Sequence, residues 1–178
     1  MRVINLKIFI YCLMFIIFSS VCFAFFSFSV PFFNGKLIIC FAYIFVIPYA
    51  LWFGLFGCLS VYLGFFLGAV LININDILLN SLLSLHAFFL AFIPFLAFKY
   101  FNVDMKLTSL KGQLVFVVFG LFIGNLVSTT WGSVIPALLN FWSWSIVLNT
   151  WVSWTAGNLI LLGIFTPLIL HYLTEYMS

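Results

Sequence analysis

The sequence predicts an all-α, polytopic transmembrane helix bundle with six spans and with both termini in the cytoplasm. Two observations lead to this fold class. Of the 178 residues, 67% are hydrophobic and only 5% are charged, whereas a soluble domain carries about 25% charged residues. Such a chain needs lipid as its surrounding solvent, because a soluble globule must keep a wetted polar surface. Its few polar breaks also leave apolar stretches of about 20 residues, the length that a bilayer-spanning helix needs.

The apolar stretches follow one another along a single transmembrane domain, 1–178. We expect membrane-spanning helices at about 8–30, 37–54, 57–74, 77–98, 114–139 and 143–173. The uncharged stretch 37–74 is too long for one helix, so Gly54 and Gly57 are expected to divide it. A further turn is expected near 139–145, where three polar residues interrupt the apolar run.

The number of spans depends on how the first half of the chain is divided. Asn34 lies in the first polar break, 73–76 forms the next, and 99–111 is the clearly polar loop. Five spans are the alternative, either if 37–74 is not divided or if the first segment is removed at Cys22-Phe23-Ala24, which resembles a signal-peptide cleavage site. We expect the first segment to be retained, because its apolar run continues to Val30 and exceeds a usual signal core.

The orientation follows from the distribution of lysine and arginine, which gather on the cytoplasmic side of membrane proteins. With the N-terminus inside, the outer side holds only Lys36, and the inner side holds Arg2, Lys7, Lys99, Lys106 and Lys111. Six spans then place the C-terminus inside as well. The six cations form no cluster of the kind that binds nucleic acid.

Motifs for catalysis or metal binding are absent from the sequence. The four cysteines stand singly, without a CxxC pair, so neither a zinc site nor a redox pair is indicated. There is no P-loop, no HExxH and no Gly-x-Ser-x-Gly. The spans also contain no paired acids, which ion-coupled pumps usually need. We therefore expect neither an enzyme nor an ion-coupled pump, and we expect no cofactor or metal.

Three small-x-x-x-small pairs predict close contacts between helices, because small residues let helix backbones approach each other in lipid. They are Gly64 with Gly68, Gly120 with Gly124 and, less clearly, Ser20 with Ala24. Packing within the monomer and contact with a partner subunit are both consistent with these pairs.

The candidate ligand site lies mainly in the last third of the chain, where five of the six tryptophans fall between 131 and 154. Trp151, Trp154 and Asn158 share one helix face by their spacing. At about 1.5 Å per residue, Asn125, Asn158 and His86 would lie near the middle of the bilayer. The candidate substrate-binding residues are Trp151, Trp154, Asn158, Asn125, Thr129, Trp131, His86 and Trp144.

Simpler roles compete with ligand binding for these residues. Trp142 and Trp144 could belong to an aromatic belt at the outer interface. Asn125 and Asn158 could form an interhelical hydrogen bond, and His86 could be a satisfied buried histidine. If the groups do form a site, stacked indoles and amides suit a planar heteroaromatic molecule.

The whole chain resembles the substrate-binding S subunit of energy-coupling factor (ECF) transporters in its length, its six expected spans, its inner termini and its polar, aromatic last third. The resemblance implies uptake of a small, vitamin-like heterocycle across the plasma membrane of a prokaryote, powered through a transmembrane coupling subunit and two cytoplasmic ATPases. Ser20 and Ala24 would match the family's first-helix contact with the coupling subunit, although that motif usually has paired alanines. Trp151, Trp154 and Asn158 would match its ligand-facing region.

A second resemblance is to MASE-type membrane-associated sensor modules. It rests on the segment Trp154-Thr-Ala-Gly-Asn158 followed by Thr166-Pro167-Leu168, and it implies a ligand-sensing role. Such modules usually have more spans and are fused to an output domain. A third alternative is a structural membrane protein in which the polar residues of 125–158 serve only to pack the helices.

Overall fold

The computed structural model describes residues 6–32, 35–72 and 76–177. Arg2, Asn34, Asn73 and Asn75, which enter the predictions above, lie outside these ranges. In chain order the elements are α1 (Leu6–Phe25), β1 (Ser27–Phe32), β2 (Gly35–Cys40), α2 (Tyr43–Phe53), α3 (Leu55–Ile72), α4 (Ile77–Phe101), α5 (Leu110–Val115), the π-helix η1 (Phe116–Gly124), α6 (Asn125–Leu138) and α7 (Trp144–Met177).

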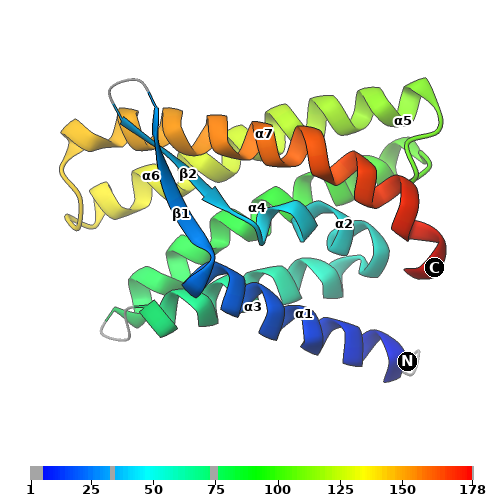
Figure 1. Ribbon diagram of the computed structural model, residues 1–178, viewed down its shortest axis with the longest axis horizontal. Helices are drawn as coiled ribbons and strands as arrows, with labels where there is room; N and C mark the ends of the chain where they lie inside the picture. The colour runs from blue at the N-terminus through cyan, green and yellow to red at the C-terminus, as the bar shows by residue number, and fades with distance from the viewer. Residues whose placement is uncertain (1–5, 33–34, 73–75, 178) are drawn as a thin grey trace.

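Five helical segments of the described chain are long and apolar enough to cross a membrane: α1, α3, α4, the continuous segment α5–η1–α6, and α7. They run roughly along the longest axis of the molecule in Figure 1. Helix α1 packs on α3, α3 on α4, α4 on α6 and α6 on α7. The short α2 contacts α3, α4 and α7, so it is enclosed by the longer helices.

The segment between α1 and α3 differs from the two helical spans expected at 8–30 and 37–54. Helix α1 ends at Phe25, and β1 then pairs antiparallel with β2, from Ser27 opposite Cys40 to Phe32 opposite Gly35. Helix α2 has 11 residues, or about 16 Å, roughly half the thickness of a bilayer core. The sequence explains the change, because Ser27-Phe-Ser-Val alternates with the strand period and Pro31 cannot continue a helix.

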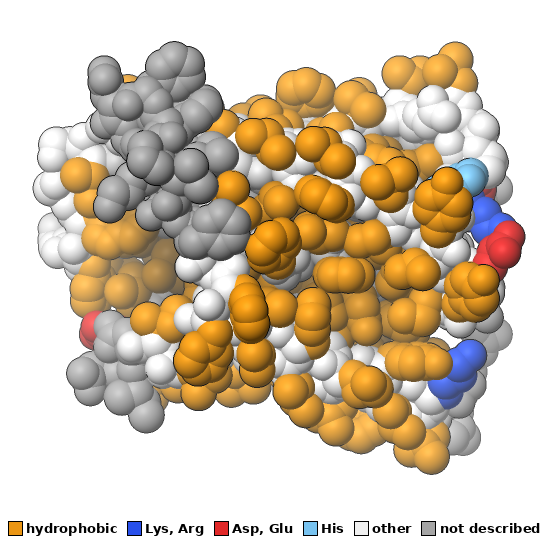
Figure 2. All heavy atoms as spheres, in the orientation of Figure 1, with side chains coloured by type: hydrophobic (Ala, Val, Ile, Leu, Met, Phe, Trp, Pro, Cys, Tyr) orange, Lys and Arg blue, Asp and Glu red, His pale blue; other side chains and the backbone are white. Residues whose placement is uncertain are grey.

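Both ends of the described chain nevertheless lie at the same end of the bundle (Figure 1). The hairpin and α2 together return the chain to the end from which α1 starts. Charged side chains gather there too: Lys7 begins α1, Lys99 lies near the end of α4, and Lys106 and Lys111 flank the start of α5. Figure 2 shows blue and red side chains at this end and an almost wholly hydrophobic surface beside it. We call it the charged end.

The contact between α1 and α3 uses the small residues noted in the sequence. A Cβ on Gly64 would collide with the Ser19 hydroxyl and lie 3.2 Å from the Ile16 carbonyl oxygen. The Ser20 hydroxyl donates to the Gly64 carbonyl at 3.0 Å. Ser20 is therefore buried against α3 within the chain, which corrects its assignment to a partner-subunit contact, and Ala24 is half-buried. The close approach of the two backbones is what takes Ser20 away from the surface.

Candidate ligand-binding site

A cavity of about 250 Å³ lies between the hairpin and the ends of α3, α4 and α7 that face away from the charged end. The lining side chains are apolar, aromatic or hydroxyl-bearing, apart from one histidine and one thiol. They belong to Phe23, Ser27, Cys40, Tyr43, Ala69, Ile72, Leu83, Ser84, His86, Trp142, Thr150 and Trp154. No carboxylate, lysine or arginine of the described chain lines the cavity.

Tyr43, His86 and Trp154 form a buried hydrogen-bonded chain across one wall of this cavity. The His86 Nδ1 lies 2.5 Å from the Leu83 carbonyl oxygen, and because a carbonyl only accepts, Nδ1 carries the hydrogen. In the uncharged ring Nε2 is then an acceptor, so the Tyr43 hydroxyl donates to it at 2.5 Å. Trp154 Nε1 donates to the same hydroxyl oxygen at 3.1 Å. All three polar side chains are satisfied by one another and by the backbone.

The ring of Trp154 is held in place from behind by a glycine. A Cβ on Gly132 would lie 2.7 Å and 2.9 Å from two ring carbons of Trp154. On the other side, the Trp154 and His86 ring centroids are 4.8 Å apart. The Gly132 position in α6 therefore sets how far the indole can lie from the cavity.

Two other lining residues keep free hydrogen-bonding capacity. Ser27 and Ser84 use their hydroxyl hydrogens on the carbonyls of Phe23 and Asn80, at 2.8 and 2.7 Å. Within the described residues, the Trp142 indole nitrogen and the Thr150 hydroxyl have no hydrogen-bond partner. Unpaired polar groups on a mostly apolar cavity wall are the arrangement that orients a bound molecule.

Asn125, Asn158 and Thr129, predicted as site residues, lie at the contact between α6 and α7 and do not line the cavity. Asn158 Nδ2 donates to Asn125 Oδ1 at 3.0 Å, and Asn125 Nδ2 donates to the Thr155 carbonyl at 3.1 Å. The Thr129 and Thr155 hydroxyls are 2.9 Å apart. The interhelical hydrogen bond considered as the simpler role is thus the one observed.

The remaining predicted tryptophans also lie outside the cavity lining. Trp131 Nε1 donates to the Leu82 carbonyl of α4 at 2.7 Å, and Trp151 Nε1 donates to the Thr130 hydroxyl at 2.9 Å. Trp144 is 59% exposed. Of the eight predicted residues, the structure brings His86 and Trp154 to the cavity.

Sequence reasoning missed Tyr43 and Trp142. The first half of the chain was expected only to pack and face lipid, and Trp142 was placed in the interfacial belt. The available signal was the tyrosine itself: a hydroxyl inside an otherwise apolar run needs a buried partner. The hairpin that brings the start of α2 to the cavity could not be inferred from a helical reading of 8–54.

We expect Asn158→Ala to lower stability without changing ligand affinity. The substitution removes a buried hydrogen bond worth about 1 kcal/mol between membrane helices. The loss should be modest, because Asn158 Oδ1 is already buried without a partner in the described chain. Thermal unfolding in detergent measures the change. Asn149→Ala, at an exposed position of the same helix, is the matched control. A large loss of ligand affinity in folded Asn158→Ala would return this residue to the site.

Comparisons with protein-family models, with curated proteins and with solved structures found no match for this chain. Its class therefore rests on its own features. The fold is that of a helical, multi-pass membrane protein, with one mainly apolar cavity between the hairpin and the helices. The described histidines, cysteines and acids form no group of three that could hold a metal ion.

Proposed function

We propose that this protein is a membrane receptor for a small, planar, uncharged heteroaromatic molecule, which it binds in the cavity beside Tyr43, His86 and Trp154. The observation that carries the proposal is the pairing of a satisfied aromatic wall with two unpaired polar groups, on Trp142 and Thr150. The aromatic faces supply stacking surfaces. The indole N–H can donate to a ring nitrogen or carbonyl, and the threonine hydroxyl can donate or accept.

The size and charge of the cavity narrow the class of ligand. Its volume of about 250 Å³ lies just below the range of about 300–1,000 Å³ found for drug-sized ligands. A molecule of one or two fused rings is therefore favoured over a larger cofactor. An ionised ligand would lose its hydration without gaining a partner of opposite charge, so an uncharged ring is favoured.

The cavity position supports capture from outside the cell. We place the charged end in the cytoplasm, because lysines gather there, and this makes the cavity face the outer leaflet. The hairpin and α2 then stand in for the second of six crossings, with both termini inside. Single cysteines introduced into 102–109 should react with an impermeant reagent only after the membrane is opened. Labelling of these positions in intact cells would reverse the orientation.

Uptake driven by separate subunits is the role we favour for such a receptor. The support is the resemblance to S subunits of ECF transporters in size, in aromatic last third and in the expected inner termini. In this role the chain binds the micronutrient in a prokaryotic plasma membrane, and a coupling subunit with two ATPases supplies the energy. Gentle extraction from native membranes should recover those subunits. Recovery of a signalling partner instead would favour the MASE-type sensor role.

Tryptophan fluorescence tests the site itself. Purified protein is titrated with one- and two-ring heterocycles of the thiamine, pterin and nucleobase types, and quenching identifies a ligand. Trp142→Phe and Thr150→Val are each expected to weaken its binding about tenfold, which corresponds to one hydrogen bond of about 1.4 kcal/mol. Trp144→Phe is the matched control, because Trp144 does not line the cavity. Equal affinity in all three variants would place binding elsewhere.

A further inference from the structure

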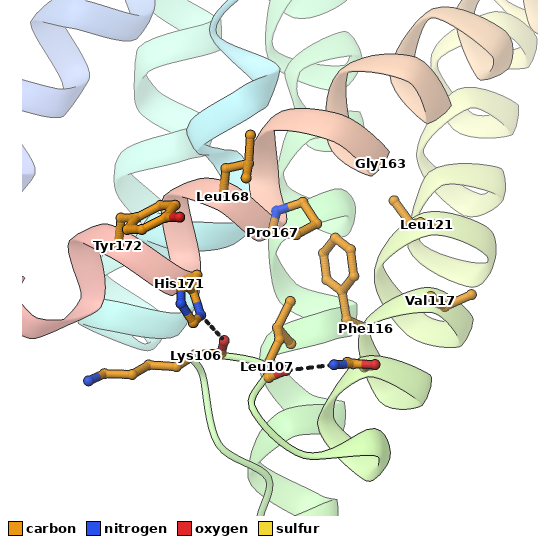
Figure 3. Close-up of a pocket in the computed structure, with 11 residues that line it drawn as sticks. Lys106, Leu107, Phe116, Val117, Leu121, Gly163, Pro167, Leu168, His171 and Tyr172 are labelled. Carbon is orange, nitrogen blue, oxygen red and sulfur yellow. Dashed lines mark hydrogen bonds between the residues drawn. The ribbon is translucent and has the colours of Figure 1, made fainter.

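A second cavity lies at the charged end, between α7, the α5–η1 segment and the loop 102–109 (Figure 3). Its volume is about 380 Å³. One half is apolar and is formed by Val117, Leu121 and Leu168, among others. The other half is polar and includes Lys106, His171 and Tyr172. We call it the charged-end groove. It is separate from the ligand cavity and shares no residue with it.

The two helices that form the groove are both irregular there. Pro167 has no backbone N–H, so the carbonyl of Gly163, four residues earlier, loses its helical partner. Both residues line the groove. Across from them, η1 is a π-helix, a form that occurs mostly in short stretches, often at functional sites. Irregular backbone at membrane depth is tolerated where it is covered by protein or lines a cavity. The groove is the place where both irregularities meet.

The polar half of the groove is a built structure. Asp104 accepts hydrogen bonds from the Lys106 and Thr108 backbone nitrogens, at 3.1 and 3.3 Å, and from the Thr108 hydroxyl at 2.7 Å. Burial raises the pKa of Asp104, but these hydrogen bonds and the charge of Lys106 outweigh it, so that the pKa lies below its usual range. Leu107 has a positive φ of 58°, and its carbonyl accepts from Gln113 Nε2 at 3.1 Å.

This loop holds positive charge at the mouth of the groove. Lys106 Nζ lies 2.5 Å from Glu175, and His171 Nδ1 donates to the Lys106 carbonyl at 3.4 Å, which leaves the other ring nitrogen outside that bond. Among described residues at this end, the lysines are 7, 99, 106 and 111 and the acids are 104 and 175. The difference of four and two leaves an excess of two positive charges.

We infer that the charged-end groove binds one anionic phospholipid. The phosphate would lie against Lys106 and His171, and one acyl chain would follow Val117, Leu121 and Leu168 into the membrane. Charge complementarity selects an anionic headgroup, since basic pockets between helices bind such headgroups. The division into a polar mouth and an apolar interior selects a lipid over a free anion. Leu168 is 51% exposed, so the groove is open sideways to the bilayer.

Native mass spectrometry of delipidated protein tests the inference with two lipids, phosphatidylglycerol and phosphatidylcholine, of identical chains. The wild-type protein should bind one phosphatidylglycerol more tightly than phosphatidylcholine. Lys106→Gln should reduce the affinity for phosphatidylglycerol about fivefold, the contribution of one lysine near an anionic headgroup, and leave phosphatidylcholine unchanged. Lys99→Gln, at the same end but outside the groove, is the matched control.

A steric variant tests the acyl-chain half. A Cβ on Gly163 would meet only Leu121 Cδ1, at 3.9 Å, so Gly163→Leu can fill the groove without a backbone collision. It should retain the wild-type unfolding temperature and lose the tightly bound phosphatidylglycerol. Glycerophosphate without acyl chains should not compete. The inference is overturned if Lys99→Gln and Lys106→Gln have equal effects, if folded Gly163→Leu keeps its lipid, or if glycerophosphate alone displaces it.

Discussion

Tyr43→Phe is expected to lower the free energy of unfolding by about 1–3 kcal/mol, because it removes one oxygen that serves two buried partners. Trp154 Nε1 loses its acceptor and His86 Nε2 loses its donor. An orphaned buried polar group costs about 1–3 kcal/mol in soluble proteins, and a hydrogen bond between membrane helices averages about 0.6 kcal/mol. The measurement is reversible unfolding in mixed detergent micelles, followed by circular dichroism.

The same substitution is expected to weaken ligand binding about tenfold or more, since Trp154 is no longer anchored on the cavity wall. Tyr49→Phe is a matched control in the same helix: Tyr49 stacks on Phe15 with ring centroids 3.7 Å apart, and its hydroxyl has no hydrogen-bond partner within the described chain. Similar losses in both variants would mean that the Tyr43 chain has no special role in stability or in the site.

Gly64→Val is expected to destabilise the protein by about 3 kcal/mol or more, the upper end of the cost of overpacking. The added side chain meets the Ser19 hydroxyl and the Ile16 carbonyl, and these belong to α1 rather than to a flexible side-chain tip. Helix α1 must move away from α3, and the bond from Ser20 to the Gly64 carbonyl is lost.

Thermal unfolding and protease sensitivity of α1 measure this loss. Gly163→Ala provides the control, because it also adds a methyl group to a membrane helix but meets only Leu121 at 3.9 Å. It should be neutral or slightly stabilising, since alanine favours the helix over glycine. Wild-type stability of Gly64→Val would show that α1 is not held by this close contact.

The sequence predicted the helical segments well wherever long apolar runs were separated by charges. Helices α4 and α7 and the segment α5–η1–α6 fall close to their expected positions, because an uncharged run of more than 20 residues has few alternatives in lipid. It did less well at 8–54. There the runs were apolar throughout, and a hydropathy pattern does not distinguish a long helix from a helix followed by a hairpin.

The candidate site shows the same division. His86 and Trp154 were recognised as unusual residues for a membrane interior, and both line the cavity. Asn125 and Asn158 were equally unusual, yet they hydrogen-bond to each other between α6 and α7. Polarity within a span says that a side chain needs a partner, but it does not say whether that partner is another helix or a ligand.

The sequence by itself determined that the chain is a helical membrane protein with its charges at the ends of its helices, since lipid excludes charge and unpaired backbone groups. Only the tertiary structure decided which polar residues face a cavity. Tyr43 reaches His86 and Trp154 because the hairpin shortens the second crossing and sets the start of α2 beside α4 and α7. That meeting depends on contacts between residues more than 40 positions apart, and no local pattern of apolar and polar residues contains it.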